Sequence, residues 1–259
     1  MFDLLLFVLL GVFSGFLSGL LGIGGGALVV PGLLWIFTLM AVPAYYSMTM
    51  AAATSLMVLV FTSLSAASIH LSRRNVLWPV VIRMLPWIVL GVLAGVFLAS
   101  TLPAAVLKRI FALFLFSIAI KMALKIKPKQ SCDQLKPMAT RSAATLIGLL
   151  SGLLGIRGGT ISVPYLIHGG VDMIKAVGTT AWVTLFVAIL GAATFAVIGG
   201  HVTVSWTTGY IYWPAVLSVV PCSVLMTRWG AWCGRRLQPD HLRRIFALIL
   251  LVLSIKMAF

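Results

Sequence analysis

Apolar residues fill most of the chain in long runs, and short stretches rich in glycine, proline and basic residues separate these runs. Runs such as 4–21, 82–100 and 181–198 approach the ~20 residues that a helix needs to cross a hydrocarbon core roughly 30 Å thick. The runs are continuous, whereas strands of a membrane β-barrel alternate between apolar and polar positions. The pattern therefore predicts an all-α, polytopic membrane protein.

The two halves of the chain repeat one sequence pattern. Residues 15–31 read GFLSGLLGIGGGALVVP and residues 148–164 read GLLSGLLGIRGGTISVP, with 12 of 17 positions identical. Residues 108–124 and 243–259 agree at ten of 17 positions. Internal repeats with glycine-interrupted helices at corresponding places are typical of secondary transporters. We therefore assign 1–124 to a first membrane repeat, 125–139 to a cytoplasmic linker and 140–259 to a second membrane repeat.

Each repeat is expected to contain five helical segments. A glycine-rich helix, at about 4–21 and 140–155, ends at a glycine break and is followed by a short apolar segment at 27–40 and 160–168. Three longer helices complete each repeat, at 45–69, 79–100 and 107–124 and at 174–198, 210–232 and 242–259. The expected unit is a glycine-broken, re-entrant hairpin followed by three transmembrane helices.

The basic residues indicate how these units are oriented. Setting aside Arg157 in the second break, 18 of the 19 lysines and arginines remain. If each hairpin enters and leaves on one side of the membrane, 15 of these basic residues lie on one side and three on the other. If instead every long helix crosses and the short segment after each break does not, the two sides hold ten and eight. Cytoplasmic loops are rich in lysine and arginine. We therefore expect inverted repeats with both termini outside and with loops 70–76, 125–141 and 233–242 in the cytoplasm; a full helix followed by a half-helix would fit the charges equally well.

Composition narrows the function. Hydrophobic residues make up 61% of the chain and charged residues only 9%, too few charges for the surface of a soluble domain. The net charge of +15 is spread over short loops, so no nucleic-acid partner is expected. The sequence shows no clear catalytic triad, metal-binding cluster or phosphate-transfer motif. We therefore expect that the protein is not an enzyme and that it binds no metal or other cofactor. The chain has no glutamate, and its four aspartates lie at ends or in loops, so an anion is favoured over a cation as substrate.

The two glycine breaks are the candidate substrate site. Broken backbone at membrane depth is tolerated where it is buried in protein or lines a cavity, and the helix after a break offers free N–H groups and a positive dipole end. A role in helix packing is the alternative, which we assign to the small faces formed by Gly15, Gly19, Gly22, Gly148, Gly152 and Gly155. The substrate role is assigned to the break residues Gly24, Gly25, Gly26, Gly158 and Gly159.

Polar residues near the breaks complete the candidate site. Arg157 stands where the first repeat has Gly24. Its planar guanidinium group can donate two parallel hydrogen bonds to an oxyanion. An arginine at the membrane interface that reaches lipid headgroups would give the same sequence pattern. The steps Thr54-Ser55 and Thr179-Thr180 begin the helix after each hairpin. Their hydroxyls can donate to an oxyanion, or bond helix backbone instead.

At these residues the chain resembles the TauE/SafE sulfite-exporter family. The resemblance is carried by the paired G-x-x-x-G-L-x-G-I-G-G-G-x-x-x-x-P blocks at 15–31 and 148–164, each followed by a Thr-Ser or Thr-Thr step, and it departs at Arg157. It implies a multi-pass permease of a bacterial inner membrane that exports sulfite, thiosulfate or organosulfonates. An anion channel and a transporter of another small organic anion are the alternatives. The partners are the anion and the bilayer, with a homodimer left open.

Overall fold

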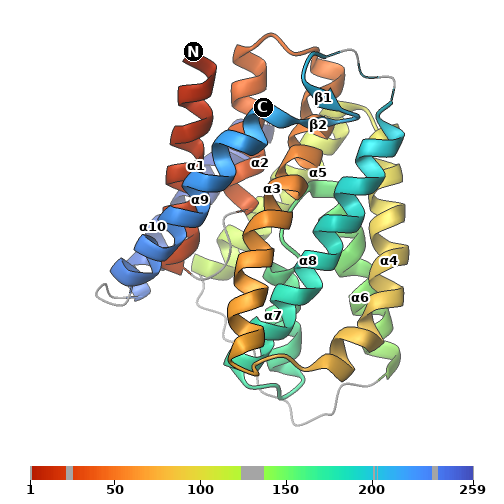
Figure 1. The fold of residues 1–259 in the computed structure, drawn as a ribbon, viewed down its shortest axis with the longest axis vertical. Coiled ribbons are helices and arrows are strands. Elements are labelled where there is room, and N and C mark those ends of the chain that lie inside the picture. The colour runs from red at the N-terminus through yellow and green to blue at the C-terminus, as the bar shows by residue number, and fades with distance from the viewer. Residues whose placement is uncertain are drawn as a thin grey trace.

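The computed structural model describes residues 2–21, 26–123, 137–200, 202, 204–234 and 239–258. This part of the chain forms ten α-helices and one two-stranded hairpin (Figure 1). The helices are α1 (Phe2–Leu21), α2 (Gly26–Leu39), α3 (Ala44–Ser72), α4 (Trp78–Thr101), α5 (Ala104–Ala123), α6 (Pro137–Leu154), α7 (Gly159–His168), α8 (Met173–Ile198), α9 (Trp213–Gly234) and α10 (Pro239–Ala258). The all-α expectation and the predicted order of helices are confirmed.

One predicted helix begins later than expected. The segment expected to start at 210 starts at Trp213, because strands β1 (Thr207–Thr208) and β2 (Ile211–Tyr212) pair antiparallel in front of it. Gly209 turns the hairpin with a φ of +60° and lies against the backbone of Ala196 at the end of α8. A left-handed backbone conformation favours glycine, so this residue fixes the tight turn.

Within the part of the chain that the structure describes, four helices are long and apolar enough to cross a membrane: α1, α3, α4 and α8. The sequence predicted α3, α4 and α8 as crossings. It predicted α1 as one half of a hairpin, although this segment is long enough to span the membrane. The 20 residues of α5 match α1 in length, but Lys108, Arg109 and Lys121 lie near its ends. Lysine and arginine near helix ends can extend their charges to the membrane surface.

Helices from the first half pack on helices from the second half. α1 lies along α9, α4 along α6, α3 along α8 and α5 along α10. Glycines allow the first two pairs to approach closely: a Cβ on Gly15 would lie 2.6 Å from the Cα of Ser223, and one on Gly148 would lie 2.5 Å from the carbonyl oxygen of Ile88. Together with Gly152, which meets Val92, these contacts confirm the packing role predicted for these three glycines. Gly22 lies outside the described residues.

Both termini lie at the same end of the bundle. Figure 1 places N and C toward the upper end, near the β-hairpin, whereas the turn between α3 and α4 lies at the lower end. α1 and α2 run in opposite directions, as do α6 and α7. If α1 with α2, and α6 with α7, are each taken as one hairpin that returns to its starting end, the remaining helices carry the chain from one end of the bundle to the other an odd number of times in each half.

Candidate functional site

The second glycine break is a sharp turn held against α3. α6 ends at Leu154, and Gly155 follows with a φ of +67°. A Cβ on Gly155 would lie 2.5 Å from the Cα of Ala52 in α3. Both the left-handed conformation and the backbone contact exclude a side chain here, so Gly155 fixes where the break sits against the first half.

The turn leaves the start of α7 open. Gly158 is the N-cap residue, and the first bonds run from the amides of Thr160 and Ser162 to the carbonyls of Arg157 and Gly158, at 3.3 and 2.9 Å. The amides of Gly158 and Gly159 have no acceptor among the described residues. Because helix dipoles place partial positive charge at this end, these two N–H groups can receive an anion.

Arg157 extends from this turn to α3. Its Nη2 donates to the hydroxyl of Thr62 over 3.1 Å. Its Nε is enclosed and has no hydrogen-bond partner in the described part of the chain. Arg157 is thus part-buried, its guanidinium turns toward α3, and its enclosed Nε keeps donor capacity, whereas an arginine that reaches lipid headgroups would direct its guanidinium away from the bundle.

Hydroxyl groups surround the two glycines at the start of α7. A Cβ on Gly158 would lie 3.3 Å from the Oγ of Ser151, and one on Gly159 would lie 3.9 Å from the Oγ1 atoms of both Thr180 and Thr184. All three side chains are buried. A buried polar cluster of this kind, in a bundle made mostly of apolar residues, is suited to hold a small polar ligand.

Ser55 faces the same break from the first half. Ala52 touches Gly155 and Thr62 bonds Arg157; Ser55 lies between them on the same face of α3, because residues three and seven positions apart share a helix face. Its Oγ is buried and has no partner among the described residues. The structure therefore places Gly159 beside Thr180, and it places Ser55 on the face of α3 that passes the turn at Gly155 and Arg157.

Three of the four predicted hydroxyls already make structural contacts, and Thr180 Oγ1 donates to the carbonyl of Val177 in its own helix over 3.0 Å. Thr54 Oγ1 accepts a hydrogen bond from the amide of Tyr212 over 3.1 Å, and Thr179 Oγ1 accepts one from the amide of Leu77 over 3.0 Å. Each of these two threonine oxygens thus accepts from the residue that directly precedes a helix of the other half, and both of these helices begin with Trp-Pro. Of the first break, Gly24 and Gly25 lie outside the described residues, and Gly26 begins α2.

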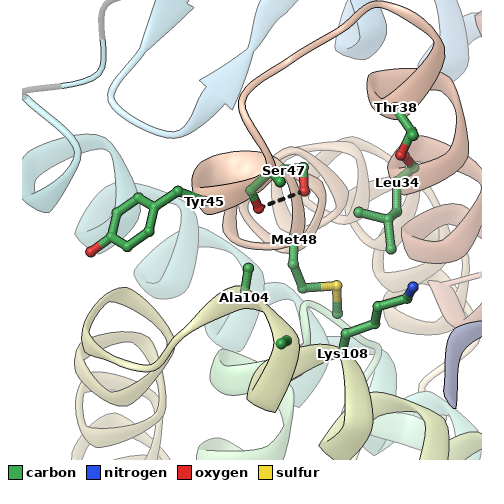
Figure 2. A pocket seen from close by; sticks show the side chains of 9 residues that line it. Leu34, Thr38, Tyr45, Ser47, Met48, Ala104 and Lys108 are labelled. Atoms are coloured by element: carbon green, nitrogen blue, oxygen red, sulfur yellow. Dashed lines mark hydrogen bonds between the residues drawn. The ribbon is translucent and has the colours of Figure 1, made fainter. Parts of the chain in front are cut away.

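Two pockets lie away from the second break. One, of about 380 Å³, is lined by Arg228, Trp229 and Trp232 of α9. The other, of about 520 Å³, lies between the end of α2 and the first turns of α3 and α5. Figure 2 shows Lys108 extending its ammonium group into this second pocket toward Leu34 and Thr38. Neither pocket is lined by a predicted site residue.

Sequence reasoning missed three polar residues of the second break. Ser151 could have been found, because serine occupies the same place of the repeated block in both halves, as Ser18 and Ser151. Thr184 lies four positions after Thr180, a spacing that places both on one helix face. Thr62 carries no sequence signal, since its role depends on how α3 passes the break.

A bundle of long apolar helices, with a broken helix and buried hydrogen-bond donors inside it, is typical of a multi-pass membrane transporter. The chain belongs to the TauE/SafE sulfite exporter family: the family described as "Sulfite exporter TauE/SafE" matches residues 7–257.

Similar proteins span almost the whole chain. A "Probable membrane transporter protein" of Haemophilus influenzae is 34% identical over 98% of this chain and 97% of its own length. A probable membrane transporter protein of Methanocaldococcus jannaschii is 29% identical over 97% of this chain and 94% of its own length. The Bacillus subtilis protein YunE, also described as a probable membrane transporter, is 22% identical over 97% of this chain and 96% of its own length. No solved structure matches the chain.

Proposed function

We propose that this protein is a secondary transporter that exports a small sulfur-containing anion, such as sulfite, thiosulfate or an organosulfonate, across a bacterial inner membrane. The anion binds between two inverted repeats, at the glycine-broken helix ends and Arg157. The predicted donors are Gly24, Gly25 and Gly26 at the first break, Arg157, Gly158 and Gly159 at the second, and the hydroxyls of Thr54, Ser55, Thr179 and Thr180.

The observation that carries this proposal is a cation with spare donor capacity, Arg157, on the residue that directly precedes the open amides of Gly158 and Gly159. Its recorded hydrogen bond goes to the neutral hydroxyl of Thr62, and no carboxylate pairs with it in the part of the chain that the structure describes. A cation kept inside a membrane protein is costly. An anionic substrate would offset that cost by forming charge-assisted hydrogen bonds with both the fork and the amides.

Both halves contribute residues at the second break, which supports a site shared between them. Ser55 and Thr62 come from the first half, whereas Arg157, Gly158 and Thr180 come from the second. A site built from both halves can change its access when one half moves against the other, which is how repeat-based transporters alternate between two sides. The description of the family as a sulfite exporter supports the sulfur-containing class of anion.

Flux measurements test the proposed activity. The purified protein is reconstituted in vesicles, and uptake of sulfite, thiosulfate, ethanesulfonate and sulfate is measured with and without a pH gradient. We expect saturable uptake of a sulfur-containing anion that responds to the gradient. Flux that follows only the membrane potential and does not saturate would favour an anion channel, and uptake of none of the four would contradict the substrate class.

Substitutions of Arg157 test its role in binding. Arg157→Lys keeps the positive charge but loses the paired donors of the guanidinium, so we expect a partial loss of affinity for the anion. Arg157→Gln and Arg157→Gly should lose more of that affinity. A hydrogen bond to a charged group contributes about 1.5–3 kcal/mol, which corresponds to roughly 10- to 100-fold in affinity. Arg141→Gln is the matched control, because Arg141 lies over the ring of Trp87 outside the break. Calorimetry with sulfite and ethanesulfonate measures each variant; equal affinities in all of them would remove Arg157 from the site.

A further inference from the structure

Ser151 has an unusual environment for a helix serine. It lies in the last turn of α6, is fully buried, and its Oγ has no hydrogen-bond partner in the described chain. The same oxygen lies 3.3 Å from where a methyl group on Gly158 would be, next to the open start of α7. An unpartnered hydroxyl in a buried position is costly, so its retention beside this helix start points to a ligand.

Several other buried helix serines donate to a carbonyl of their own helix or its cap, and Ser254 of α10 donates to the carbonyl of Ala112 in α5 over 2.8 Å. Ser14 donates to the carbonyl of Gly11 over 3.4 Å, and Ser162 donates to that of Gly158 over 2.8 Å. Ser63 donates to Leu59. This local bond is the usual choice for a serine inside a helix. Ser55 and Ser151 depart from it, and both of them face the second break.

We propose that Ser151 and Ser55 are neutral hydrogen-bond donors to the transported anion, and that this donor set selects a singly charged oxyanion over a doubly charged one. The inference rests on the proposed function. The unpartnered donors of the break are the two hydroxyls, the amides of Gly158 and Gly159 and the Nε of Arg157. Of these groups, Arg157 alone carries a positive charge.

The charge balance sets the preference. Neutral donors can satisfy several oxygens of a sulfonate or bisulfite, and the guanidinium matches its single negative charge. A dianion such as sulfate or thiosulfate would bring a second charge into the bundle that no cation at the break neutralises, and burying an unpaired charge is strongly unfavourable. Of the anions proposed above, the inference therefore favours bisulfite and organosulfonates over thiosulfate. The neutral donors therefore add affinity through geometry without adding charge.

Calorimetry tests both parts of this inference. We compare binding of ethanesulfonate and sulfate to the full-length protein and to Ser151→Ala, Ser55→Ala and Ser142→Ala. Ser142 is the control because it lies on the exposed face of α6 and bonds the carbonyl of Ala139. We expect wild type to bind ethanesulfonate at least about tenfold more tightly than sulfate, and each of the two site variants to lose about tenfold for ethanesulfonate, with Ser142→Ala unchanged. Unchanged affinity in both site variants, or equal binding of sulfate, would overturn the inference.

A second measurement does not depend on the natural substrate. In a background without native cysteines, Ser151→Cys is treated with an anionic and with a cationic methanethiosulfonate, and the two rates are divided by those at Ser142→Cys. We expect the anionic reagent to react preferentially at position 151. Replacing Arg157 with glutamine should remove that preference. If wild type binds no sulfur-containing anion but the preference remains, the proposed substrate is wrong and the anion site stands. Equal normalised rates, or no reaction with either reagent, would overturn the anion site itself.

Discussion

At the residue scale, glycines that look alike in the sequence meet different surroundings. By sequence, Gly91 is an ordinary glycine within a long apolar run, yet a Cβ there would lie 2.2 Å from the carbonyl oxygen of Thr145. A Cβ on Gly159, at the break, would meet only the hydroxyls of Thr180 and Thr184, both at 3.9 Å. A methyl group therefore fits at Gly159 in the candidate site and clashes at Gly91 in the span, the reverse of what the sequence suggests for these two positions.

Gly159→Ala separates a substrate role from a packing role. The methyl group makes ordinary contacts, and alanine is at least as good a helix former as glycine, so we expect normal expression and an unchanged melting temperature. Transport should fall about tenfold or more, because the methyl group occupies the space where the anion would approach the open amides. Uptake in vesicles and thermal unfolding in detergent give the two readouts.

Gly200→Ala is the matched control for this variant. A Cβ there would meet only the carbonyl oxygen of Val197, at 3.7 Å, and the residue lies beyond the end of α8. Its transport should equal that of wild type. Wild-type transport by Gly159→Ala as well would mean that the anion does not approach this part of the break.

At the scale of helices and strands, much of the architecture follows from the sequence. The ten helices are predictable because each is a long apolar run that ends at glycine, proline or basic residues. The β-hairpin is not, because Thr207–Thr208 and Ile211–Tyr212 continue into the apolar run of α9 and only the turn at Gly209 separates them. The glycine breaks point to the site, but the free hydroxyl of Ser151 depends on its rotamer and on packing between helices, which no spacing encodes.

The close contact of α4 with α6 leads to a prediction about stability. Gly91→Ala places its methyl group 2.2 Å from the Thr145 carbonyl oxygen, so the two helix backbones must separate. Overpacking of this kind costs typically 1–3 kcal/mol, and here the obstacle is backbone, which cannot rotate away. We expect a lower melting temperature in detergent and a smaller yield of monodisperse protein, relative to Gly200→Ala. An unchanged melting temperature would mean that the helices are not in close contact there.

Two threonines connect the helices of opposite halves. Thr54→Val and Thr179→Val keep the side-chain shape but remove the acceptors for the amides of Tyr212 and Leu77. Each change leaves a part-buried N–H group without its bond, which costs about 1–3 kcal/mol. We expect both variants to unfold at a lower temperature than wild type. Thr101→Val is the control, since its exposed hydroxyl bonds Phe97 of its own helix, and equal melting temperatures in all three would contradict the role.

At the scale of the whole molecule, the two ends of the bundle differ in charge. The end opposite to the termini holds Arg73 and Arg74 between α3 and α4, Arg141 near the start of α6 and Lys175 near the start of α8, among other basic residues. Only Lys108, Arg109 and Lys256, among the described basic residues, lie toward the end with the termini. Basic residues concentrate on the cytoplasmic side of membrane proteins. The end that carries the turn between α3 and α4 is therefore expected to face the cytoplasm.

Single cysteines can test this orientation in a background without the native cysteines. A cysteine at Arg74 should react with a membrane-impermeant reagent only from the cytoplasmic side, and one at Ser205, before the β-hairpin, only from outside. Both positions are exposed. Cysteines at Lys129 and Gln238, which lie outside the described residues, should react from the same side as position 74. Labelling of positions 74 and 205 from one side would rule out the inverted arrangement.

The exchange of partners between the halves has a consequence for synthesis. When the first half leaves the ribosome, α1 and α4 are complete, but α9 and α6, against which Gly15 and Gly91 pack, have not yet been made. Membrane helices associate through close contact between such small residues, so the early chain exposes two unmatched glycine faces to lipid. The bilayer, or a chaperone within it, must shelter these faces until the second half inserts, and the slowest step of biogenesis is expected to be the joining of the two halves.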